Sequence, residues 1–407
     1  MSLLPVEEAL KRLLDKAEPV TDCQTVPLTM ANGRVLAKPV AARLTQPPFD
    51  ASAMDGYAVR RESLKAKAKQ VTLHVVGESA AGRAYTGTVA AGEAVRIFTG
   101  APVPSDCDAV VIQENVVRQA DMIDVLPDGR KPDGPSHIRK AGQDFKAGDT
   151  LLEPGQRLDP WRLSLVAAAG LDAVPVWRRP KIAVLCTGDE LVLPGQTPKP
   201  HQIYESASHA LMALIKQWGG KASYVGVEAD DARGLHKALK NTKADLIVTV
   251  GGASVGDYDL VRPALEKLGL ALDFASVAVK PGKPTSFGRL TDGTRILSLP
   301  GNPASAFVTA QLFLKAWIEA SLGMPETSPF ITAVTQGPLS AAGPRESYLR
   351  AKIGSSLQGQ LQVTAFDDQD SSLVSVFARA DALIRLPANT LPQNAGSRVE
   401  VLPLDRL

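Results

Sequence analysis

Four loops rich in glycine, lysine and acidic residues are the parts of this 407-residue chain best suited to chemistry. Each one follows a run of apolar residues that is typical of a strand. The loops are Thr187-Gly188-Asp189-Glu190, Gly251-Gly252-Ala253-Ser254-Val255-Gly256-Asp257-Tyr258-Asp259, Lys280-Pro281-Gly282-Lys283-Pro284 and Pro300-Gly301-Asn302-Pro303. In an open parallel sheet, ligands bind beyond the carboxyl ends of the strands. The loops are therefore predicted to converge on one anionic ligand.

The loop that begins Gly251-Gly252 predicts a cradle for a phosphate-like group. Glycines let the backbone approach an anionic oxygen closely, and Ser254 adds a hydroxyl donor. A Gly-Gly pair after a strand is, by itself, more often a tight turn than an anion site. The loop matches neither the Walker A pattern nor GxGxxG with a confirming acid. An ordinary ATPase or dinucleotide enzyme is therefore not supported.

Lys280 and Lys283 flank a Pro-Gly pair on a single short loop. Lysines on loops are usually solvated, which is the plain alternative here. The prolines restrict the backbone, however, and this restriction favours two ammonium groups held near one anion.

Acidic residues at neighbouring strand ends suggest a hard-cation site. Taken singly, each of them is more often a helix N-cap than a ligand. Together, beside two lysines and without histidines at metal-ligand spacing, they predict Mg²⁺ bridging carboxylates and a phosphate. These residues are Asp189, Glu190, Asp230, Asp257 and Asp259.

An alternation of strands and helices is expected to position these loops. Residues 182–185 and 246–250 are apolar enough to form strands buried on both faces, and a helix pattern over 210–218 ends at Gly219-Gly220. Residues 181–326 are therefore predicted to form a three-layer α/β domain with a largely parallel sheet.

The segments on either side of this domain show a different sequence pattern. Short β-rich runs separated by glycine and proline turns predict an inserted β-rich domain over residues 21–144, and a small β domain over 327–407. Between them, Asp159 and Pro160 predict the N-cap and first position of a helix. Turn-rich loops of the β-rich segment carry single reachable polar groups, which taken alone indicate ordinary turns. These groups are Asp55, Thr99, Arg139 and Asp144.

The composition narrows the class of protein. Lys+Arg 45 against Asp+Glu 43 gives a net charge of +2, which favours neither nucleic acid nor an anionic membrane as a partner. The three widely spaced cysteines predict no disulfide framework and no cysteine-based zinc site. With no signal-peptide pattern and no apolar run of about 20 residues, the chain is predicted to be cytoplasmic.

Six strings together resemble the molybdopterin molybdenumtransferase family, the MoeA-like proteins that include the E domain of gephyrin. The likeness runs from the first helix to the C-terminus. Its carriers are SAMDGYAV at Ser52–Val59, TGAPVP at Thr99–Pro104, TGDEL at Thr187–Leu191, GGASVGDYD at Gly251–Asp259, KPGKP at Lys280–Pro284 and LPGNPAS at Leu299–Ser305.

The resemblance implies an L-shaped homodimer of four-domain subunits. Residues 1–20 with 145–180 would form a discontinuous linker domain that carries the dimer contact, and 181–326 would resemble the molybdopterin-adenylylating fold. The active site would lie between that domain and the β domains of the partner subunit. Asp55, Thr99 and Asp144 would then face it across the interface.

The reaction implied is insertion of molybdate into adenylylated molybdopterin, with release of AMP and molybdenum cofactor. Glu190 and Asp259 would hold Mg²⁺, and Lys280 and Lys283 would neutralise phosphate or molybdate. Asp230 and Asp55 would position water or the transferred group. The adenylyltransferase and molybdoenzyme acceptors would be further partners. Substrate contacts are assigned to Thr99, Arg139, Thr187, Gly251, Gly252, Ser254, Pro300, Asn302, Pro303, Arg345, Arg350 and Ser371.

The chain departs from the family pattern in three places. Ala51 and Ala207 stand where the family commonly has Asn, and Asp370 stands where a small residue is common after Gln369. Lost amide groups remove donors and acceptors near the cleft. Two alternatives stay open: an adenylyltransferase acting one step earlier, and a non-catalytic scaffold or paralogue that retains the fold.

Overall fold

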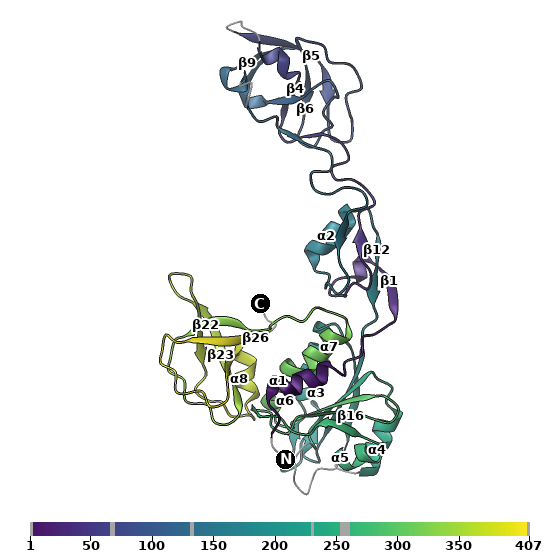
Figure 1. Ribbon diagram of the computed structural model, residues 1–407, viewed down its shortest axis with the longest axis vertical. Coiled ribbons are helices and arrows are strands. Elements are labelled where there is room, and N and C mark those ends of the chain that lie inside the picture. The colour runs from purple at the N-terminus through teal and green to yellow at the C-terminus, as the bar shows by residue number, and fades with distance from the viewer. Residues whose placement is uncertain (1–2, 66–69, 131–133, 229–231, 253–260, 405–407) are drawn as a thin grey trace.

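The computed structural model describes residues 3–65, 70–130, 134–228, 232–252 and 261–404. The molecule is elongated and bent (Figure 1). An α/β region lies at one end and a β-rich region at the other, and a narrow neck joins them. The C-terminal β region lies beside the α/β region. The four-part architecture predicted from the sequence is confirmed.

The α/β region is built on a six-stranded sheet in the order β16-β13-β17-β21-β20-β18. The first four strands are parallel, and β20 pairs antiparallel with both β21 and β18. Every residue of β17 is buried, which agrees with its unbroken apolar sequence. The bounds are β13 (Lys181–Thr187), β16 (Lys221–Glu228), β17 (Leu246–Val250), β18 (Ala271–Phe274), β20 (Ser286–Arg289) and β21 (Arg295–Leu299).

Helices cover both faces of this sheet and give the predicted three layers. On one face α4 (Ala232–Asn241) and α5 (Val261–Glu266) enclose a smaller core. The other face carries the larger core, under α1 (Val6–Leu14), α3 (Ala207–Gln217), and the continuous run of α6 (Pro303–Thr309), the π-helical turn η5 (Ala310–Leu314) and α7 (Lys315–Ser321). Ala9 and Leu13 of α1 are fully buried there. The first helix therefore packs on the α/β region, not on the linker domain to which it was assigned.

The neck consists of two small antiparallel ladders and one helix. Its elements are β1 (Cys23–Pro27) paired with β12 (Ala173–Trp177), β2 (Val40–Ala41) paired with β11 (Thr150–Leu152), η1 (Leu28–Met30) and α2 (Pro160–Ala168). Asp159 caps α2 as predicted, because its carboxylate accepts the Arg162 amide at 2.8 Å. Residues 23–41 pair with 150–177, so they belong to the neck and not to the inserted domain expected to begin at residue 21.

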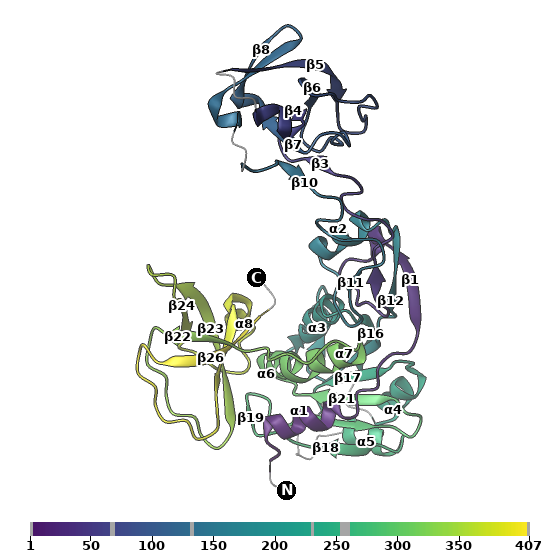
Figure 2. The same cartoon turned by 45° about the horizontal axis from the view of Figure 1, so that its top comes forward.

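The β-rich region is a six-stranded sheet in the order β7-β4-β6-β5-β9-β8, visible at the top of Figure 2. A short pair, β3 with β10, lies where this region meets the neck. The bounds are β3 (Ala51–Ser52), β4 (Gly56–Val59), η2 (Arg61–Lys65), β5 (Val71–Ser79), β6 (Glu93–Ile97), β7 (Ala109–Ile112), η3 (Gln113–Asn115), β8 (Val116–Gln119), β9 (Met122–Val125), η4 (Pro127–Arg130) and β10 (Ile138–Arg139).

The C-terminal region is a closed barrel. Its sheet runs β19-β23-β24-β22-β26-β25, and a further pairing of β25 with β23 closes the ring. The bounds are β19 (Val279–Lys280), β22 (Ile331–Thr335), β23 (Glu346–Ser355), β24 (Leu361–Ala365), α8 (Val374–Arg379), β25 (Ala382–Leu386) and β26 (Arg398–Pro403).

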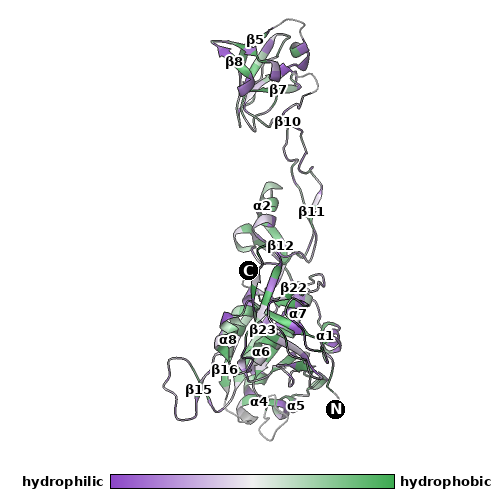
Figure 3. Cartoon of the chain, turned by 90° about the vertical axis from the view of Figure 1, so that its left-hand side faces the viewer, coloured by the Kyte–Doolittle hydropathy of each residue, from purple (hydrophilic) through white to green (hydrophobic). Residues whose placement is uncertain are grey.

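Figure 3 shows the loop that carries β15 (Ile203–Tyr204) projecting from the α/β region. This strand pairs in parallel with β14 (Leu191–Val192). Within the described ranges, no helix is long and apolar enough to cross a membrane.

Candidate active site

A cavity of about 660 Å³ opens at the carboxyl end of the parallel strands. We call it the sheet-edge cavity. It is bounded by the ends of β13, β17 and β21 and by the first residues of α3 and α6. The predicted site residues that line it are Thr187, Glu190, Gly251, Gly252, Pro300, Asn302 and Pro303. Loops far apart in the sequence thus converge here, as the parallel-sheet argument predicts.

The Gly251-Gly252 pair brings two strand ends into close contact. Gly251 and Gly252 have φ of +91° and +58°, where other residues are strained. A Cβ on Gly251 would lie 2.5 Å from the carbonyl oxygen of Thr187, so only glycine fits. The Thr187 hydroxyl is buried without a hydrogen-bond partner among the described residues. An unsatisfied polar group therefore lies at the floor of the cavity.

Glu190 is exposed at the mouth of this cavity. A Cβ on Gly188 would approach the Glu190 Oε2 atom to 2.6 Å, so the carboxylate folds back over the glycine backbone. The described part of the chain holds no cluster of three or more metal-ligating side chains. Mg²⁺ usually binds one or two carboxylates together with substrate phosphates, so an exposed carboxylate at the mouth of a cavity with room for phosphate groups suits it.

Glu205 forms a buried polar floor that was not predicted as part of the site. Its side chain is 2% exposed and accepts from the amide and hydroxyl of Ser208 at 2.7 and 2.5 Å. The Cys186 thiol donates to it at 3.4 Å, and burial together with Glu205 raises the pKa of that thiol. Ala207 lines the same cavity, so the missing amide at this position enlarges it.

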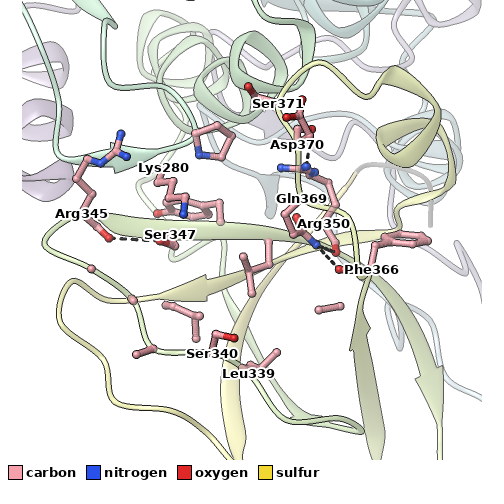
Figure 4. A pocket seen from close by; sticks show the side chains of 18 of the residues that line it. Lys280, Leu339, Ser340, Arg345, Ser347, Arg350, Phe366, Gln369, Asp370 and Ser371 are labelled. Atoms are coloured by element: carbon pink, nitrogen blue, oxygen red, sulfur yellow. Dashed lines mark hydrogen bonds between the residues drawn. The ribbon is translucent and has the colours of Figure 1, made fainter.

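A second cavity, of about 700 Å³, lies between the α/β region and the barrel. We call it the arginine cavity. Lys280, Arg345, Arg350 and Ser371 all line it, and Figure 4 shows Lys280 drawn between the two arginines. These four residues come from three separate stretches of sequence. The cavity therefore gathers the cations predicted to contact an anion.

Arg350 is the most constrained of these cations. It is 1% exposed, its Nη2 donates to the Asp370 carbonyl at 2.9 Å, and its amide donates to Gln369 Oε1 at 2.9 Å. Its Nε is buried without a partner in the described structure. Burial lowers the pKa of Arg350, although arginine remains a cation in proteins. A buried, only partly satisfied guanidinium favours an oxyanion as its missing partner.

The Lys280–Pro284 loop is placed differently from the prediction. The strand before it, β19, pairs with β23 of the barrel and not with the parallel sheet. The loop therefore bridges two regions. Lys280 lines the arginine cavity, whereas Lys283 is exposed and lines neither cavity. The structure does not bring the two ammonium groups together on one anion, because the intervening Pro-Gly turn separates them.

A thin wall separates the two cavities. Asn302, in the sheet-edge cavity, donates through Nδ2 to Ser371 Oγ at 2.9 Å, and the Ala304 amide donates to the Ser371 carbonyl at 3.1 Å. Ser305, which is 5% exposed, lines both cavities. The cavities are thus neighbours with one shared boundary.

Four predicted site residues lie elsewhere. Asp55 accepts from the Thr99 amide and hydroxyl at 2.7 and 2.8 Å, and these bonds lower the pKa of Asp55. Both belong to the β-rich region, at the far end of the molecule from the cavities (Figure 1). Arg139 in β10 and Asp144 lie where that region joins the neck. Asp230, Ser254 and Asp259 fall outside the described residues, and so does Asp257.

Three family models match the chain along its length. They are the MoeA N-terminal region (domain I and II) over residues 4–170, a probable molybdopterin binding domain over 183–320 and the MoeA C-terminal region (domain IV) over 332–404. The molybdopterin molybdenumtransferase of Haemophilus influenzae is 34% identical over 409 residues, which is 100% of both chains. The chain belongs to the MoeA family of molybdopterin molybdenumtransferases.

Further similarities extend over the whole chain. Molybdopterin molybdenumtransferase 2 of Mycobacterium tuberculosis is 36% identical over 95% of this chain and 97% of its own length. The crystal structure of the molybdopterin biosynthesis protein MoeA from Pyrococcus horikoshii superposes with a TM-score of 0.84 at 28% identity. It covers 99% of this chain and 100% of its own.

Several lining residues of this MoeA-family chain were missed from the sequence. Ser305 lies within the LPGNPAS string, and its place two residues after the helix-starting Pro303 was the available signal. Glu205 and Tyr204 gave a weaker sequence signal, because acidic and aromatic residues before a helix are common. Gln369 becomes recognisable only once the barrel brings it to Arg350.

Proposed function

We propose that this protein inserts molybdate into adenylylated molybdopterin and releases AMP. The observation that carries the proposal is the adjacency of two chemically different cavities. One is lined by glycine backbone, hydroxyl groups and two glutamate carboxylates, and the other by three cations and two aspartate carboxylates. The two cavities are neighbours on either side of the wall at Ser371. A reaction between two separately bound anions requires such closely spaced sites.

The sheet-edge cavity is suited to the adenylylated pterin. Its phosphate groups would lie against Gly251 and Gly252, with the Thr187 hydroxyl as donor. Glu190 would hold Mg²⁺, which would offset the phosphate charge. Pro300, Asn302 and Pro303 complete the wall on the side of β21.

The arginine cavity is suited to the oxyanion. Arg350 offers a planar, buried fork, and Lys280 adds an exposed ammonium. In the reaction two dithiolene thiols replace one oxide of molybdate, which leaves as water. A second water cleaves the phosphate–phosphate bond and releases AMP. The cations stabilise the anions while they approach one another.

We also propose that the active form is a homodimer. Asp55, Thr99, Arg139 and Asp144 are far from both cavities of their own chain, so they can reach a cavity only on a second copy. The neck offers a large apolar side chain for such a contact, because Trp161 of α2 is 83% exposed.

The alternatives are less well supported. A free adenylyltransferase has no need of a barrel that supplies most of the lining of an anion cavity, and the relatives matched over nearly the whole chain are named molybdenumtransferases. A scaffold has no need of a buried, partly unsatisfied arginine.

The direct test is incubation of the purified protein with adenylylated molybdopterin, Mg²⁺ and graded molybdate, with AMP release followed over time. AMP release that rises and saturates with molybdate is expected. Release that ignores molybdate would refute the proposal. Glu190→Gln should weaken the Mg²⁺ dependence while circular dichroism stays unchanged. Glu153→Gln, at an exposed neck position, is the control.

A further inference from the structure

Asp370 places a negative charge in the wall of the arginine cavity. It lies between Gln369 and Ser371, and its carbonyl accepts from Arg350 Nη2 at 2.9 Å. Figure 4 shows it beside Arg350. An acidic side chain is unexpected where an anion is to be bound, because it opposes the attraction of the cations.

The carboxylate is held in a fixed orientation. Its Oδ1 accepts from the Ser372 amide at 2.8 Å and from the Ser372 hydroxyl at 2.6 Å, the pattern of a local side-chain turn. These bonds hold the charge at the rim of the cavity, where the side chain is exposed to solvent.

The effect of Asp370 depends on the net charge of the cavity. Lys280, Arg345 and Arg350 face two lining carboxylates, Asp367 and Asp370, which leaves a formal balance of +1. A tetrahedral dianion such as molybdate carries two negative charges. The cavity is thus one positive charge short of neutralising it.

We propose that Asp370 sets the affinity of the arginine cavity for a dianion by weakening its hold on that ligand. The inference rests on the proposed function. A loosely held oxyanion leaves Arg350 readily and passes the Asn302–Ser371 wall, whereas a fully neutralised one would stay trapped. Asp370 would then set the concentration of oxyanion at which the cavity fills.

The substitution Asp370→Asn isolates the charge. Asparagine has the same shape, and its carbonyl oxygen still accepts the Ser372 amide, so the turn is retained. Asp292→Asn is a matched control, because Asp292 accepts the amide two residues ahead, from Thr294 at 2.9 Å, yet lines neither cavity.

The full-length variants are titrated with sodium molybdate by calorimetry at fixed ionic strength. We expect Asp370→Asn to bind molybdate roughly three- to tenfold more tightly than the wild type, and the gain to shrink as salt is added. Asp292→Asn should bind as the wild type does. In turnover the KM for molybdate should fall by the same factor.

Equal affinity of Asp370→Asn and the wild type would overturn the inference and leave the proposed function standing. Tighter binding without a lower KM would also overturn it, because the site titrated would lie off the reaction path. If Arg350→Ala, which removes the guanidinium charge, binds molybdate as well as the wild type, the arginine cavity is not the oxyanion site and the inference falls. Molybdate-dependent AMP release by that variant would still support the proposed function.

Discussion

Asn302 donates a hydrogen bond to Ser371 at 2.9 Å, and this contact joins two segments that lie on opposite sides of the candidate site. Asn302 ends the loop after β21, and Ser371 precedes α8 of the barrel region. The backbone bond from Ala304 to Ser371 runs alongside it. The wall between the two cavities is therefore formed jointly by the α/β region and the barrel region.

Asn302→Ala should slow AMP release without unfolding the protein. The substitution removes one side-chain hydrogen bond at an exposed position, which contributes about 1 kcal/mol. The backbone bond to Ser371 remains, so molybdate affinity by calorimetry should change less than twofold while kcat falls roughly tenfold. Asn394→Ala, an exposed barrel-region residue, is the control. A kcat equal to that of the wild type would remove Asn302 from the reaction.

Mixed dimers provide a test of the shared active site. Asp55→Asn and Arg350→Ala should each abolish most turnover as pure proteins, because every site would lack one group. When the two are unfolded, mixed in equal amounts and refolded together, half of the dimers contain both chains, and each has one intact site. Recovery of roughly one quarter of wild-type activity is then expected. Activity that stays at the level of the pure variants would argue against sites shared between chains.

The ion pair of Arg178 with Asp245 should make stability depend on pH. Arg178 donates to both carboxylate oxygens of Asp245, at 2.6 and 2.9 Å, and ties the neck to the α/β region. Burial alone would raise the pKa of Asp245, but the bonds from Arg178 and from the Lys181 amide outweigh it, and the pKa is lowered.

Because the folded pKa is depressed, the stabilisation is present above the unfolded carboxyl pKa of about 3.9 and is lost as the pH falls through the folded value. Asp245→Asn should therefore cost about 1–3 kcal/mol at pH 7, and this cost should shrink as the pH falls below about 3.9. Urea unfolding at pH 7 and at a series of lower pH values measures the difference. Asp22→Asn, which removes the exposed partner of Arg178, should cost less than about 0.5 kcal/mol. A pH-independent effect of Asp245→Asn would contradict the linkage.

The three cysteines should differ in reactivity. Cys23 is exposed, whereas Cys107 and Cys186 are 8% and 1% exposed. Burial and the neighbouring Asp106 and Asp108 raise the pKa of Cys107 to about 12, so it stays protonated at neutral pH. At pH 8 a thiol reagent should titrate one fast group in the native protein and three after unfolding. Cys23→Ser should abolish the fast phase, and a remaining fast phase would show that a core opens.

Local patterns accounted for most of the elements. The apolar run of β17 and the Asp159–Pro160 start of α2 contain their own signals, so they were predictable. The grouping of elements was not. The amphipathic face of α1 indicates that the helix packs on another element but does not say on which one. Its contact with α7 forms only when the whole α/β region folds.

The same limit applies to the site. Thr187, Gly251 and Asn302 were grouped correctly, because the carboxyl ends of parallel strands share an edge. The fate of Lys283 could not be foreseen, since β19 leaves the parallel sheet and pairs with the barrel. Glu205 was overlooked because its role comes from burial, which the spacing of residues does not reveal.

The pairing of β19 with β23 has a mechanical consequence. Lys280 is carried on a strand hydrogen-bonded beside the strand that presents Arg350, with Lys280 opposite Ser347. The α/β segment and the barrel therefore cannot rotate apart without breaking that ladder, and the arginine cavity is preassembled. Movement that brings a second copy's Asp55 toward the substrate is expected instead at the two chain segments that connect the neck to the β-rich region. Near residues 46 and 145 these segments pair with each other only through an isolated bridge and a few backbone hydrogen bonds. The molecule would therefore bend between the neck and the β-rich region while the arginine cavity keeps its shape.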